Sequence, residues 1–176
     1  MTTLVFYALT SVSVAGEWIQ DENTGCAVWN PAPQSGESIL WSGECTNQRA
    51  SGYGVLKWLR DGEKFETAEG FFTDGKLEGE GAWHWASGHR YLGDFAEGEF
   101  DGEGVFTWPD GARYSGGFRN NERHGLGRHL APNGARYEGP YRRGERHGTG
   151  RCYLPGSGWS QCRWHEGERI DGLTEV

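Results

Sequence analysis

The stretch Tyr91-Leu92-Gly93-Asp94-Phe95 recurs twice, as Tyr114-Ser115-Gly116-Gly117-Phe118 and as Tyr137-Glu138-Gly139-Pro140-Tyr141. Each copy is followed by a further set of glycines at matching positions, which are Gly102 and Gly104, Gly125 and Gly127, and Gly148 and Gly150. The leading tyrosines lie 23 residues apart. A fixed period of this size is typical of repeat arrays in which each unit is one small supersecondary element.

These residues resemble the MORN repeat (membrane occupation and recognition nexus), in which Tyr-x-Gly-x-aromatic is followed by spaced glycines. The segments Asn121–Gly125 and Gly144–Gly148 match this pattern closely, and the resemblance decays outward over about residues 41–167. It implies an all-β, elongated, single-layer antiparallel β-meander of about six repeat hairpins, of the exported bacterial type. The family's association with scaffolding and with membrane-linked assemblies implies an interaction protein.

The composition favours a thin sheet over a conventional two-layer core. The chain of 176 residues has 30 Gly and only 35% hydrophobic residues, yet it contains 9 Trp, 8 Phe and 7 Tyr. Aliphatic residues normally supply most of a two-layer core. We therefore expect one array held together by aromatic packing.

The chain divides into four parts. Residues 1–16 are either a secretory signal peptide, since an apolar stretch ends in Ser13-x-Ala15, or a first β-strand, which their Val, Thr and aromatic content suits equally. Residues 17–25 are polar and form a cap or linker, residues 26–167 form the repeat array, and residues 168–176 form a C-terminal tail.

The Asp-Gly dipeptides predict hairpin turns and fix a strand register. A three-residue loop at Asp110-Gly111-Ala112 places Phe106 opposite Gly116 and Gly104 opposite Phe118. Aromatic rings would then cover the bare backbone of glycines on the neighbouring strand. The side chains two residues apart share one face, so stacked hairpins would form one aromatic stripe.

The same register pairs the four cysteines. Cys152 falls opposite Cys162 in the last hairpin, and Cys26 falls opposite Cys45 in a first hairpin that joins residues 26–30 to residues 39–45. Directly opposed cysteines can suit a disulfide, and bridges at both ends would hold the repeats that lack a neighbour. The alternative is four free thiols in the cytosol; zinc is disfavoured because no Cys-x-x-Cys is present.

No catalytic constellation is evident, so we expect a protein that is not an enzyme and binds no cofactor or metal. His124 and His147 recur one period apart, which favours a repeated surface residue over a general base. Neither a Gly-x-Ser-x-Gly nor a Gly-x-x-x-x-Gly-Lys motif occurs. An enzyme acting in a groove of the sheet is the weakest reading.

Charge is distributed unevenly along the array. Residues 1–111 carry 18 acidic and 6 basic side chains, a net charge of −12, whereas residues 112–176 carry 7 acidic and 11 arginine side chains, a net charge of +4. The candidate interaction surface is the basic half with its tryptophans: Arg119, Arg123, Arg128, Arg142, Arg143, Arg146, Arg151, Trp159, Arg163 and Trp164.

Two kinds of partner suit this charge distribution. The first is a protein, including a second copy that binds head to tail through unlike charges and exposed end strands. The second is an anionic lipid or an acidic glycan on the arginine half. Nucleic acid is disfavoured because the isoelectric point is about 5.2. With the disulfides and the signal-like segment, we expect the protein to be secreted or to lie in the periplasm or cell envelope.

Overall fold

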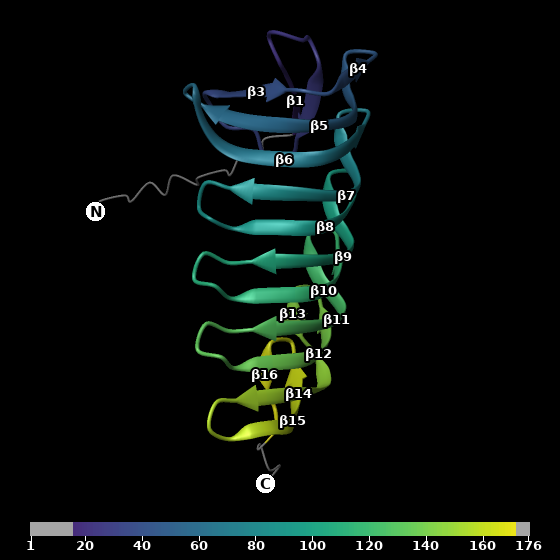
Figure 1. Ribbon diagram of the computed structural model, residues 1–176. Helices are drawn as coiled ribbons and strands as arrows, with labels where there is room; N and C mark the ends of the chain where they lie inside the picture. The colour runs from purple at the N-terminus through teal and green to yellow at the C-terminus, as the bar shows by residue number, and fades with distance from the viewer. Residues whose placement is uncertain (1–15, 172–176) are drawn as a thin grey trace, which may run out of the picture.

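The computed structural model describes residues 16–171, so the predicted signal segment lies outside the described residues except for Gly16. The described residues form strands and turns with no helix, and from β5 (Arg49–Arg60) to β15 (Gly158–His165) the long strands stack in chain order along an elongated molecule (Figure 1). The strands are β1 (Glu17–Gln20), β2 (Ala27–Asn30), β3 (Glu37–Trp41), β4 (Glu44–Thr46), β5 (Arg49–Arg60), β6 (Glu63–Thr73), β7 (Lys76–Trp85), β8 (Arg90–Ala96), β9 (Glu99–Thr107), β10 (Arg113–Arg119), β11 (Glu122–Leu130), β12 (Arg136–Arg142), β13 (Glu145–Arg146), β14 (Gly148–Leu154), β15 (Gly158–His165) and β16 (Glu168–Arg169).

These strands form one open sheet in the order β1-β2-β5-β6-β7-β8-β9-β10-β11-β12-β14-β15-β16. Neighbours pair antiparallel from β5 onward, which confirms the predicted all-β meander. The sheet is mixed because β2 meets β5 in a parallel bridge, between Ala27 and Arg49.

The predicted register of the hairpins is wrong by two residues. Phe106 lies opposite Tyr114 and not opposite Gly116, whereas Gly116 lies opposite Gly104. The loop is Pro109-Asp110-Gly111, closed by a hydrogen bond from the Trp108 amide to the Ala112 carbonyl. Proline has no amide hydrogen to donate to a sheet ladder, so Pro109 is displaced from the strand into the turn.

Because the register differs from the prediction by an even number of residues, every side chain keeps its predicted face of the sheet. Aromatic rings still cover glycines of the neighbouring strand, but each ring reaches diagonally to a glycine that is not directly opposite it. A Cβ added at Gly104 would lie 2.5–2.6 Å from ring atoms of Tyr91, and one added at Gly127 would lie 2.4–2.6 Å from ring atoms of Tyr114. Tyr137 covers Gly150 in the same way. Each tyrosine therefore packs against a glycine of the following strand that lies two residues before the residue directly opposite the tyrosine.

The opposite end of each hairpin is a two-residue turn in which both residues have positive φ. Glu97 and Gly98 have φ of 53° and 82°, and Asn120 and Asn121 have φ of 48° and 65°. Such turns match the twist of paired strands. They also join neighbouring units, because the Gly98 amide donates to Leu77 O at 3.0 Å and the Asn121 amide donates to Phe100 O at 3.1 Å.

The predicted first hairpin is also wrong. β2 does not pair with β3; β2 pairs with β1, and β3 and β4 both pair with β5. The Trp29 amide in β2 donates to the carbonyl of Gly75, in the turn between β6 and β7, at 3.1 Å. β2 therefore runs past the two-residue turns at residues 47–48 and 74–75. It covers part of the face of the sheet that carries the buried tyrosines, which is called the inner face from here on.

Candidate binding surfaces

The inner face carries a buried aromatic column. Tyr91, Tyr114 and Tyr137 are at most 1% exposed. Their hydroxyl groups donate to the backbone carbonyls of Asp94, Gly117 and Pro140 at 2.9–3.0 Å. Burial raises the pKa of all three phenols, that of Tyr137 to about 12. These tyrosines form the core of the array.

Two arginines of the predicted interaction surface belong to this core. Phe100 stacks on Tyr91 with 3.8 Å between ring centroids, and Arg123 and Arg146 occupy the same repeat position one and two periods later. The Arg123 guanidinium lies 5.1 Å from the ring centroid of Tyr141, and that of Arg146 lies 5.0 Å from Tyr137 and 4.7 Å from Trp164. These two guanidinium groups thus replace an aromatic ring as packing partners of the tyrosines.

Arg146 also lies beside His129, with 3.3 Å between Nη2 of Arg146 and Nδ1 of His129. Burial lowers the pKa of His129, and the positive charges of Arg146 and Arg123 lower it further. Trp164, also half-buried, completes this cluster on the inner face. The structure therefore brings Arg123, Arg146 and Trp164 together, but away from the exposed arginines.

The opposite, outer face gathers another part of the predicted set. The Glu138 carboxylate lies 3.8 Å from Arg128 Nε and 3.7 Å from Arg151 Nη1. The guanidinium of Arg151 lies 4.7 Å from the ring of Trp159, which is 40% exposed. Two cations share one carboxylate here, so this surface keeps an excess positive charge.

The remaining predicted arginines are exposed and more dispersed. Arg142 pairs with Glu166 at 3.2 Å, and Arg143 occupies the first position of a two-residue turn with φ of 52°. Arg119 ends β10. Arg163 is in β15, where its amide donates to the Asp171 carboxylate at 3.0 Å.

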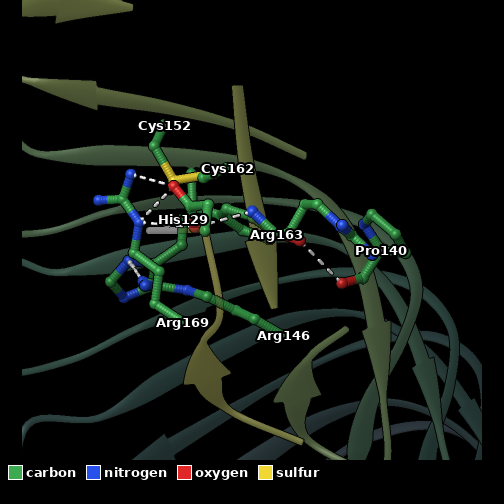
Figure 2. Close-up of a disulfide and its surroundings, with 9 residues drawn as sticks. His129, Pro140, Arg146, Cys152, Cys162, Arg163 and Arg169 are labelled. Carbon is green, nitrogen blue, oxygen red and sulfur yellow. Dashed lines mark hydrogen bonds and ion pairs between the residues drawn. A yellow bond between two sulfur atoms is a disulfide. The ribbon is translucent and has the colours of Figure 1, made fainter. Parts of the chain in front are cut away.

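Both predicted cysteine pairs are found, although they are not placed as the register argument expected. Cys152 lies opposite Ser160 and Cys162 opposite Gly150, so the bridge runs diagonally over a Cα–Cα distance of 5.9 Å. Figure 2 shows this bridge together with Arg163 and Arg169, and with His129 beside Arg146. Cys26 and Cys45 are bridged over 5.6 Å, although their segments do not form a hairpin.

The Cys152–Cys162 bridge stands where other repeats place a ring and a glycine. Cys162 is one period after Gly139, and Ser160 is one period after Tyr137. In the preceding repeat the ring of Tyr137 lies against Gly139. Ser160 has no such ring, so the position after it has room for a side chain, and Cys162 occupies it fully buried.

A cavity of about 390 Å³ lies between β2 and the inner face of β5–β7. It is lined by aromatic and charged side chains, including Trp29, Arg60, Phe65, Glu66 and Trp83. Sequence reasoning missed it because the cavity depends on β2 crossing the inner face, whereas β2 was predicted to pair with β3 at the end of the array.

Comparison with known families agrees with the geometry. The family model of the MORN repeat matches four consecutive segments, residues 69–90, 91–113, 114–136 and 137–159. The chain belongs to the MORN repeat family. The last three matches begin at Tyr91, Tyr114 and Tyr137, the tyrosines of the buried column. No curated protein matches the chain significantly.

MORN repeats are in general non-enzymatic scaffold repeats that bind proteins or membranes. Within residues 16–171, no group of three or more His, Cys, Asp or Glu side chains is placed to hold a metal ion. In the same range, no helix is long and apolar enough to cross a bilayer. The two cysteine pairs of this MORN array point to an oxidising environment.

Proposed function

We propose that this MORN protein is a non-enzymatic scaffold that binds protein, including further copies of itself joined head to tail, in the periplasm, in the cell envelope or outside the cell. The proposal rests on one observation: the sheet has an open strand edge at each end, and the half of the chain at one end is acidic while the half at the other end is basic. The compartment is supported by the two disulfides, since such bridges persist where the environment is oxidising.

Both ends of the sheet have free strand edges among the described residues. On its far side β15 pairs only with β16, through Trp164 and His165, so the backbone edge of residues 158–162 has no partner strand. At the other end β3 pairs with β5 alone; the Trp41 amide on its outer edge donates to the Asp21 carboxylate at 2.8 Å, and the edge of residues 37–40 has no partner strand. Unpaired strand edges are templates for pairing with another chain.

The charges favour contact between unlike ends. The end with β3 belongs to the half with a net charge of −12, and the end with β15 belongs to the half with a net charge of +4. A contact between two different surfaces of the same protein does not close on itself unless the rotation forms a ring, so such contacts extend into filaments or rings.

Light scattering at low and high salt tests this proposal. We expect oligomers at about 0.01 M salt and dissociation towards monomers at about 1 M, because the Debye length falls from about 30 Å to about 3 Å. A protein that is monomeric at every ionic strength would contradict self-association.

A charge-reversal pair locates the contact. The double variant Arg143→Glu/Arg163→Glu removes exposed positive charge from the basic half and should abolish the salt-sensitive oligomers. The matched control, Lys57→Glu/Arg90→Glu, makes the same charge change at exposed positions of the acidic half and should leave the oligomers intact. Equal behaviour of the two variants would exclude a contact between unlike ends.

A second candidate function is the binding of an anionic lipid or acidic glycan by the outer face of the basic half. The observation in its favour is the group formed by Arg128, Arg151 and Trp159, where the exposed indole lies beside the guanidinium of Arg151 and Arg151 shares the Glu138 carboxylate with Arg128. Tryptophan beside arginine suits a membrane surface, because the indole packs at the level of the lipid headgroups and the guanidinium pairs with a lipid phosphate.

Co-sedimentation with vesicles tests this candidate. We expect binding to phosphatidylglycerol vesicles but not to phosphatidylcholine vesicles, with loss of binding as salt rises. Arg128→Gln/Arg151→Gln should weaken the binding, while Arg90→Gln in the acidic half should not. Equal binding of both vesicle types would contradict a charge-based site.

A further inference from the structure

The cavity under β2 has an aromatic and acidic lining. Trp58 and Phe72 are at most 5% exposed, and with Trp29, Phe65 and Trp83 they supply most of its ring surface. Its charged lining residues are four carboxylates, Glu37, Glu66, Glu97 and Glu99, and two cations, Arg60 and Lys76. The walls are therefore aromatic with an excess of two negative charges.

One guanidinium group is already held in this lining by a ring and a carboxylate. The Arg60 guanidinium lies 4.4 Å from the ring centroid of Phe65 and 3.1 Å from the carboxylate of Glu37. Glu37 also accepts hydrogen bonds from the Asn30 side chain at 2.8 Å and the Gln34 amide at 3.0 Å. The cation, ring and carboxylate thus satisfy one another.

Glu66 and Trp83 repeat this ring and carboxylate combination, but no cation completes it. The indole Nε1 of Trp83 donates to Glu66 Oε2 at 2.9 Å. Glu66 forms no ion pair among the described residues. Burial and the charge of Glu37 raise its pKa, while the hydrogen bond from Trp83 and the charge of Arg60 act in the opposite direction. A half-buried carboxylate beside an aromatic ring, with no cation paired to it, is the surface that an organic cation completes.

Trp58 adds a second unsatisfied group to the lining. Its Nε1 is buried and has no hydrogen-bond acceptor among the described residues. A buried donor without an acceptor costs about 1–3 kcal/mol.

We propose that this cavity binds the ammonium or guanidinium group of a cationic ligand, with the cation paired to the Glu66 carboxylate and lying against the face of the Trp83 indole, whose N–H edge donates to the same carboxylate. A free small cation and a lysine or arginine side chain of a partner share this chemistry. The site needs neither self-association nor an anionic surface, so it stands apart from the functions proposed above.

Calorimetric titration of the unaltered, oxidised protein provides the first test. N-acetylarginine amide should bind saturably, whereas N-acetylcitrulline amide, a neutral molecule of nearly the same shape, should bind at least tenfold more weakly. Tetramethylammonium and the peptide Gly-Arg-Gly distinguish the sources: tight binding of the peptide alone indicates a protein side chain, and comparable binding of the small cations indicates a free ligand. No saturable binding of any cation, or equal binding of arginine and citrulline amides, would overturn the proposal.

Two substitutions locate the site. Glu66→Gln keeps the shape and the acceptor for Trp83 but removes the charge, so affinity for the arginine amide should fall at least tenfold. The control Glu80→Gln changes an exposed carboxylate outside the cavity lining and should leave affinity unchanged, with thermal unfolding verifying that both variants fold. Equal loss of affinity in both variants, or in neither, would place the cation elsewhere and refute the assignment.

Discussion

Between tyrosine and glycine the fit leaves no room for one methyl group. Neither Gly104 nor Gly127 has a positive φ, so their backbone conformations are open to other residues. What requires glycine is the tyrosine ring of the preceding strand, which occupies the place of a Cβ. The recurrent glycines of the sequence thus include those that turn the chain, those that lie under a ring and those that lie against the backbone of the next strand.

Gly127→Ala tests the second kind. Because the new methyl group would lie about 2.4–2.6 Å from ring atoms of Tyr114, the ring must move and the free energy of unfolding should fall by about 1–3 kcal/mol. Urea unfolding measures the change. The control Gly111→Ala has open space around its Cβ at a φ of 87°, so it should show only the roughly 1 kcal/mol cost of a left-handed backbone. A change at Gly127 no larger than at Gly111 would contradict the ring contact.

The buried phenols predict alkaline destabilisation. Burial raises the pKa of Tyr91, Tyr114 and Tyr137 above the ordinary value of 10.0. A group whose pKa is higher in the folded state contributes its full stability below the unfolded pKa and loses it as pH rises through the folded pKa. Stability should therefore be constant up to about pH 10 and then fall, by roughly 2–3 kcal/mol for a phenol shifted by two units.

Thermal unfolding between pH 8 and pH 12 checks this expectation, with phenolate absorbance as the second readout. The unfolding temperature should begin to fall near pH 10, below the pH at which the buried phenols ionise in the folded protein. Ionisation of all tyrosines near pH 10 in the folded protein would show that the column is open to water.

At the scale of strands and turns, the period of 23 and the Tyr-x-Gly pattern predicted the hairpins and their faces correctly. At the loop after Trp108 the register was missed by two residues because the loop was predicted as Asp110-Gly111-Ala112, whereas it begins at Pro109. Pro109 recurs as Pro132 and Pro155, each at the start of the loop. The missing amide hydrogen of proline was the available signal for this loop position.

The cysteine pairs were predicted on the assumption of direct opposition, and the bridges hold without it. Each is expected to stabilise the array by about 3 kcal/mol in the chain-entropy estimate. Cys152→Ala/Cys162→Ala should therefore lower the free energy of unfolding by about that amount in urea, and Cys26→Ala/Cys45→Ala should act similarly.

Intact mass with and without reductant is the direct control for this prediction. Each bridge should add two hydrogens on reduction, and each double-alanine variant should keep one reducible bridge. A mass unchanged by reductant would mean free thiols, and it would remove both the stabilisation and the argument for an oxidising compartment.

At the scale of the molecule, each repeat contacts only its neighbours, so stability should vary along the array. The central strands β8–β12 have neighbours on both sides, whereas β16 is a two-residue strand paired only with β15. Hydrogen exchange should be slowest in β8–β12 and fastest at both ends. Reduction of the disulfides should accelerate exchange at the ends and leave the centre unchanged; uniform acceleration would mean that the array unfolds as one unit.

The cap and its cavity could not be predicted from the repeat pattern. Residues 17–20 and β2 lie outside the periodic part, and β2 is positioned by contacts far along the chain, such as that of Trp29 with Gly75. The ring of Trp83 and the carboxylate of Glu66 come from different strands, 17 positions apart in sequence. Only the register of β6 on β7, together with the cap, brings these groups to one wall.

Because each of these tyrosines covers a glycine of the following strand, the contact between successive units has a polarity along the array. Each tyrosine of the column reaches forward, so a unit of this kind inserted between two existing ones receives a ring from the unit before it and offers one to the unit after it. In the first unit the ring of Trp41 takes the place of the tyrosine and covers Gly54. In the last unit Ser160 occupies the tyrosine position, so this unit has no ring to place over a following strand. Duplicating residues 114–136 should therefore lengthen the protein by one whole step, whereas appending a unit behind Ser160 would leave its first glycine uncovered.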